Sequence, residues 1–172
     1  METLTKIDAA KRQLNTAITM WFHGEDTIST HTLACAAYQL VHDVNSSRGG
    51  PELIYDSICF KDEFRGKVIQ HLRREYDFFR HADRVPESTI DFDDSHTEPF
   101  LIFSCYGLEA LGVVPDVIRG AMGIYYSVRN PDHLTDTGRK RFIDSLPIDT
   151  IEAVRAAPRK QFFETYQFLR QR

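Results

Sequence analysis

Cysteine is scarce in this chain of 172 residues, and its few thiols are far apart. The three cysteines are Cys35, Cys59 and Cys105, and none of them belongs to a C-x-x-C pair. An odd number of widely spaced cysteines argues against a disulfide framework or a zinc knuckle, and it is typical of reduced, buried thiols. The pattern therefore favours a cytoplasmic protein.

Long apolar runs are also missing. No stretch approaches the roughly 18 apolar residues of a membrane-spanning helix, and residues 1–14 lack the apolar core of a signal peptide. The sequence thus predicts a soluble protein that does not enter a membrane. A net charge of −4 and a pI of about 6.0 argue against nucleic-acid binding through overall positive charge, so any such binding needs a local basic patch.

Several catalytic signatures are absent as well. The chain has no glycine-rich phosphate loop, no nucleophile elbow and no H-E-x-x-H sequence. This argues against nucleotide hydrolysis, serine hydrolase and zinc protease chemistry, and no cofactor is implied. The period-2 alternation of a half-buried strand is also missing, so the predicted fold class is all-α.

Apolar residues at helical spacing fill most of the chain. In the first such segment, Ile18 and Trp21 lie on the apolar face, and Gly24 ends the helix. The length is that of one domain, which we expect to be a helical bundle over about residues 5–130 with extra C-terminal helices over about 132–172. The continuity of the third helix beyond Arg73 stays open. Helices are expected at 4–22, 29–45, 61–79, 97–111, 115–129 and 159–170.

The second predicted helix has two unlike faces. One carries apolar residues, including Leu40, and is expected to face the core. The opposite face carries His31, Cys35, Tyr38 and His42, which predicts a helix packed on both sides. Either the histidines are hydrogen-bonded between helices, or His31 points into a cleft. The i, i+4 spacing of His31 and Cys35 also suits zinc, but two further ligands would be needed.

The stretch 73–84 is the strongest candidate for a site. It combines four arginines, one histidine and two aspartates with a Phe-Phe pair that can anchor the backbone. Guanidinium groups bind phosphate or carboxylate through paired hydrogen bonds, and a histidine can move a proton near neutral pH. The alternative is a helix whose arginines are solvated or paired with nearby acids. The candidate ligand-binding residues are Arg73, Arg80, Arg84 and, from the second helix, His31.

An acidic loop follows this stretch, with Asp91, Asp93 and Asp94 close together. Carboxylates at such spacing can bind a hard cation, but a calcium loop needs a glycine that is missing here. We therefore interpret the loop as solvated charge and assign no metal ligand.

Two motifs resemble a known family. Ala36-Ala37-Tyr38 and His42 resemble the Ala-Tyr-rich helix of HEPN domains, which are all-α bundles of prokaryotic toxin, defence and nucleotide-handling proteins. Many HEPN domains carry an arginine, then four to six other residues, and then a histidine; here six residues separate Arg74 from His81. The segments 29–33 and 78–83 also resemble an uncharacterised bacterial protein family.

The resemblance implies a metal-independent ribonuclease site that is shared between the subunits of a homodimer. His81 would act as general acid or base, Arg74 or Arg80 would stabilise phosphate charge, and Asp77 would orient one of them. Two other interpretations stay open: a module that binds RNA, a nucleotide, another anionic ligand or a partner protein, or a structural dimer. The preferred prediction is the binding module, with Arg74, Asp77 and His81 as the catalytic residues of the ribonuclease alternative.

Overall fold

The computed structural model describes residues 1–53, 62–81, 83 and 85–170, with the backbone alone for 62–68. The fold is all-α: 73% of the chain is helical, and the described part contains no strand. None of the helices described is long and apolar enough to cross a membrane. The elements are α1 (Lys6–His23), α2 (Thr27–Ser47), α3 (Asp62–Arg80), η2 (Asp94–His96), α4 (Thr97–Ala110), α5 (Val117–Arg129), η3 (Pro131–His133), α6 (Asp136–Phe142), α7 (Ile148–Ala156) and α8 (Arg159–Arg170).

Local capping explains where the first two helices begin and end. Thr5 and Asp8 form a capping box at the start of α1, and Gly24 ends this helix in the left-handed conformation, with φ of 67°. Asp26 then caps α2 by accepting a hydrogen bond from the backbone N–H of Ser29. The predicted helix bounds are thus close to the observed ones. Helix α3 is continuous through Arg73, which answers the question that the sequence left open.

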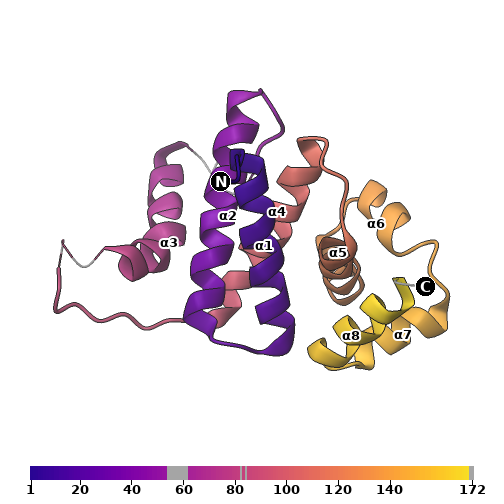
Figure 1. The fold of residues 1–172 in the computed structure, drawn as a ribbon. Helices are drawn as coiled ribbons and strands as arrows, with labels where there is room; N and C mark the ends of the chain where they lie inside the picture. Colours follow the sequence, from indigo (N-terminus) through magenta and orange to yellow (C-terminus); the bar gives the residue numbers. More distant parts are fainter. Residues whose placement is uncertain (54–61, 82, 84, 171–172) are drawn as a thin grey trace.

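Helices α1, α2 and α4 form the centre of the bundle (Figure 1). Ile18 is fully buried and Trp21 is 9% exposed, as predicted. At Gly107 of α4 a side chain would collide with Val41 of α2 and with Leu53, so glycine is needed for this close approach.

The prediction for the faces of α2 is wrong in one respect. Leu40 is only partly buried, whereas His31, Cys35 and Tyr38 on the opposite face are each 0% exposed. Helix α2 contacts α1, α4 and α3, so its covered surface is not limited to the face that the apolar residues predict. The face of α2 that carries His31, Cys35 and Tyr38 is therefore the more deeply buried one.

The C-terminal helices pack on α5 and α1, at the end of the molecule opposite α3 (Figure 1). The ring of Phe163 in α8 stacks on Phe22 of α1, with 4.5 Å between the centroids. Trp21 and Tyr125 add edge-to-face contacts around the same position. This aromatic cluster joins α8 to the central bundle.

Candidate functional site

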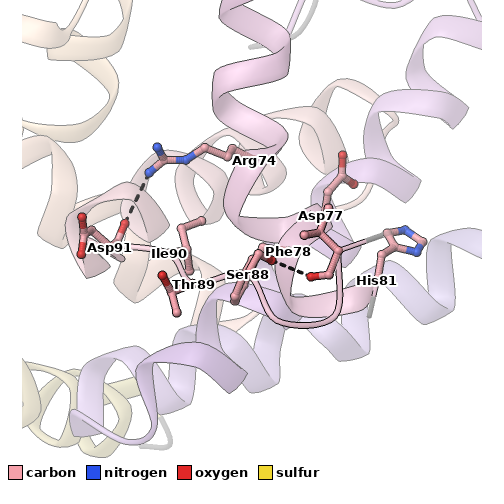
Figure 2. A pocket seen from close by; sticks show the side chains of 9 residues that line it. Arg74, Asp77, Phe78, His81, Ser88, Thr89, Ile90 and Asp91 are labelled. Carbon is pink, nitrogen blue, oxygen red and sulfur yellow. Dashed lines mark hydrogen bonds between the residues drawn. The ribbon is translucent and has the colours of Figure 1, made fainter. Parts of the chain in front are cut away.

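The last turns of α3 bring three predicted site residues to one groove. Arg74, Asp77 and His81 recur at helical spacing and therefore project from one face of the helix. They line a groove of about 360 Å³ whose opposite wall is the segment 85–91 (Figure 2). The remaining lining residues are Phe78, Val85, Ser88, Thr89, Ile90 and Asp91.

Arg74 lies at one side of this groove. Its guanidinium donates a hydrogen bond to the backbone carbonyl of Asp91 at 3.3 Å, and it lies 3.8 Å from the Glu75 carboxylate. The side chain is 53% exposed. Because a guanidinium has five N–H donors, these contacts leave most of its donors available to a ligand.

His81 and Asp77 lie on the other side of Phe78 from the Arg74 guanidinium (Figure 2). The His81 side chain is 34% exposed, and its Nδ1 lies 3.7 Å from a carboxylate oxygen of Asp83. Seven residues along a helix correspond to roughly 10 Å. A ligand that contacts both Arg74 and His81 must therefore have several linked groups, as a nucleotide does.

The other arginines of the stretch point elsewhere. Arg73 donates a 2.9 Å hydrogen bond to the side-chain carbonyl of Gln39 in α2. Arg80 stacks over the ring of Tyr76, with its guanidinium carbon 4.6 Å from the ring centroid. Neither lines the groove, because their helical phase turns them toward α2 and Tyr76. Arg84, the fourth predicted arginine, lies outside the described residues.

His31 is a buried residue between helices, and it does not line the groove. Its side chain is 0% exposed; Nδ1 lies 3.0 Å from the Thr97 hydroxyl, and Nε2 lies 3.3 Å from the Cys35 sulfur. Burial lowers the pKa of His31, while the nearby Glu75 carboxylate acts in the opposite direction. Of the two interpretations that the sequence left open, the geometry supports the hydrogen-bonded interhelix histidine.

Glu75 is a buried residue that sequence reasoning did not single out. It is 4% exposed, and its carboxylate accepts a hydrogen bond from Nδ1 of His96 at 3.0 Å. The same carboxylate lies 3.9 Å from Nε2 of His31. A signal was present: Glu75 lies between Leu72 and Phe79 on the apolar face of α3, where a charge needs partners.

The acidic loop and the cysteines have local roles. Asp93 caps η2 by accepting a hydrogen bond from the Ser95 N–H, which lowers the pKa of Asp93. Burial raises the pKa of the Cys35 and Cys105 thiols, so both are poor nucleophiles. Cys59 lies outside the described residues. Within the described part of the chain, no group of three or more His, Cys, Asp or Glu residues is placed to hold a metal ion.

The chemistry of the groove is mixed. Its lining combines a guanidinium, an imidazole, two hydroxyl groups and the aspartates Asp77 and Asp91. The apolar side chains of Phe78, Val85 and Ile90 complete the lining. A comparison with protein-family models, curated proteins and solved structures gives no match for this chain. The assignment of function therefore rests on the groove itself.

Proposed function

We propose that the groove on α3 binds a small organic anion, with a nucleotide as the ligand class that suits it best. The observation that carries this proposal is the placement of Arg74, Asp77 and His81 along one groove with an apolar wall. Arg74 would hold a phosphate group through paired hydrogen bonds. Phe78 would contact a base, and the Ser88 and Thr89 hydroxyls would bind polar edges of the ligand.

The expected contribution of Arg74 to the binding affinity follows from the hydrogen bonds that it would make with the phosphate. A hydrogen bond to a charged group contributes about 1.5–3 kcal/mol, and the half-exposed position of Arg74 keeps the value near the lower end of that range. Removal of the Arg74 guanidinium should therefore weaken binding roughly 10-fold. Arg80, which lies on α3 outside the groove, provides a matched arginine for comparison.

Isothermal titration calorimetry with adenosine 5′-monophosphate tests the proposal. The wild type should bind this nucleotide more tightly than it binds adenosine, because adenosine lacks the phosphate. Arg74→Ala should lose roughly 10-fold in affinity, whereas Arg80→Ala should bind like the wild type. Equal losses in the two variants, or no binding by a folded wild type, would contradict a nucleotide site in this groove.

We infer a second candidate function, metal-independent RNA cleavage of the HEPN type. It is favoured by one observation: the Arg74–His81 pair that the HEPN resemblance singles out lines a single groove with Asp77. His81 would remove the proton from a ribose 2′-hydroxyl or return one to the leaving oxygen. Arg74, at the other side of Phe78, would hold a neighbouring phosphate of the same RNA. Asp77 would orient the bound ribose or His81.

The cleavage candidate is tested with a labelled RNA in EDTA, over about pH 6–8 around the ordinary histidine pKa. His81→Ala should reduce the rate roughly 100-fold or more and leave RNA binding nearly unchanged. His71→Ala, a histidine of the same helix outside the groove, is the control and should cleave like the wild type. Cleavage that survives His81→Ala would exclude this mechanism and leave the groove as a binding site.

A further inference from the structure

A second groove lies between α7 and α8, over α5. Its volume is about 590 Å³, and its lining is mainly apolar, with Ile124, Leu146, Val154 and Phe162 among the lining residues. Helices α7 and α8 lie at the end of the molecule opposite α3 (Figure 1). This groove is therefore separate from the candidate site, and its role does not depend on the function proposed for α3.

The apolar surface continues outside the groove. Leu169 lines the groove and is 63% exposed, and its neighbour Phe168 is 55% exposed. Large exposed apolar side chains beside an apolar groove mark surfaces that other molecules cover. Helix α8 thus forms part of the apolar groove and also carries exposed apolar side chains that could fill a groove of this kind.

Two opposite charges also line this groove, Asp149 at the start of α7 and Arg170 at the end of α8. Among the described residues that line it, no other is charged. In the described part of the chain neither forms an ion pair, and Arg170 stacks over the ring of Tyr166 at 5.4 Å. The surface therefore carries one positive and one negative group, each able to accept a partner from another chain.

We propose that a second copy of this chain docks on the α7–α8 groove and forms a two-fold symmetric dimer. A two-fold interface must be complementary to itself, because the same patch is used by both copies. The α7–α8 surface meets this condition: Leu169 and Phe168 of each copy cover the groove of the other, and Asp149 of each copy pairs with the partner's Arg170. A single binding partner of one charge would leave one of the two charges unpaired.

This dimer has a consequence for the groove on α3. Because α3 lies at the opposite end of the molecule from α7 and α8 (Figure 1), the two α3 grooves lie away from the interface and act separately. The dimer thus differs from the HEPN arrangement, in which the subunits share one site. Loss of the dimer should leave binding at the α3 groove unchanged.

Sedimentation velocity over about 1–100 µM tests the interface. Asp149→Arg alone and Arg170→Asp alone should each weaken self-association at least 10-fold, because each places like charges at both related contacts. An equimolar mixture of the two variants should form a heterodimer, detected with a fluorescent label on one of them. The double variant Asp149→Arg/Arg170→Asp should dimerise like the wild type.

Leu169→Ser provides an independent variant, since it removes an apolar contact and no charge; it should also weaken the dimer. The altered side chains are exposed, and circular dichroism confirms that each variant is folded. A wild type that is monomeric over the whole range would overturn the proposal and leave the groove to another ligand. A dimer that none of these variants weakens would overturn it too, since the interface would then lie elsewhere.

Discussion

Two histidines that the sequence marks as candidate functional residues, His31 in α2 and His81 directly after α3, have opposite environments. His31 in α2 is 0% exposed and has Thr97 and Cys35 as partners. His81, just after α3, is 34% exposed and lines the groove. The difference lies in the helices: α2 is packed against α1, α3 and α4, whereas the groove face of α3 has, among the described residues, the segment 85–91 opposite it.

The comparison shows how packing decides the role of a polar residue. On a helix that is enclosed on several sides, a polar side chain must find protein partners, because an unpaired buried group costs about 1–3 kcal/mol. His31 is such a group, and its partners come from α2 itself and from α4. On a helix with one open face, the same kind of side chain keeps its hydrogen-bonding atoms available to a ligand. Arg74 and His81 are in that position.

The largest expected effect concerns stability. Tyr38→Ala in α2 should lower the free energy of unfolding by about 3–5 kcal/mol, because it leaves a cavity at a position with no exposed surface. Phe78→Ala in α3 should cost under about 1.5 kcal/mol, since this ring faces the groove. Urea denaturation of both variants measures the difference. Equal losses would mean that α3 is as firmly packed as α2.

His31 and His81 should also differ in how much each contributes to the free energy of unfolding. His31→Ala should cost about 2–4 kcal/mol, because it leaves a cavity and deprives the Thr97 hydroxyl of its partner. His81→Ala should change stability by less than about 0.5 kcal/mol, as is usual at the surface. Thermal and urea unfolding at pH 7 provide the measurement. A loss above 2 kcal/mol for His81→Ala would show a structural role there.

A smaller change in the free energy of unfolding should appear as the pH is lowered. Burial lowers the pKa of His31 in the folded protein, while the unfolded chain keeps the ordinary value of about 6.5. As the pH falls below about 6.5, the unfolded chain takes up a proton that the folded protein does not, so the free energy of unfolding decreases by up to about 1.4 kcal/mol per pH unit.

His31→Gln removes this titration and is the matched control. The difference in stability between the wild type and His31→Gln should therefore shrink as the pH is lowered from about 7 to 5, through the ordinary histidine pKa. Contributions from the other histidines cancel in the difference. If the difference stays constant over this range, His31 is not held neutral by burial.

The helices and part of the candidate site could be predicted because both depend on local spacing. The sequence singled out Arg74, Asp77 and His81 together, and their spacing places them on one face because α3 continues through Arg80. Glu75 was missed because its burial depends on His96 and His31, which come from other parts of the chain. Arg73 was wrongly expected in the site, because its hydrogen bond with Gln39 depends on the packing of α3 on α2 and cannot be seen in the sequence.

The sequence by itself determined that this protein is all-α and that Gly24 ends the first helix. Each of these follows from backbone geometry and side chains within a few residues. Only the tertiary structure decided which face of α2 is deepest and which histidine is buried. Those outcomes depend on contacts such as His31 with Thr97, 66 residues apart, because burial is a property of the surfaces that meet when distant helices pack.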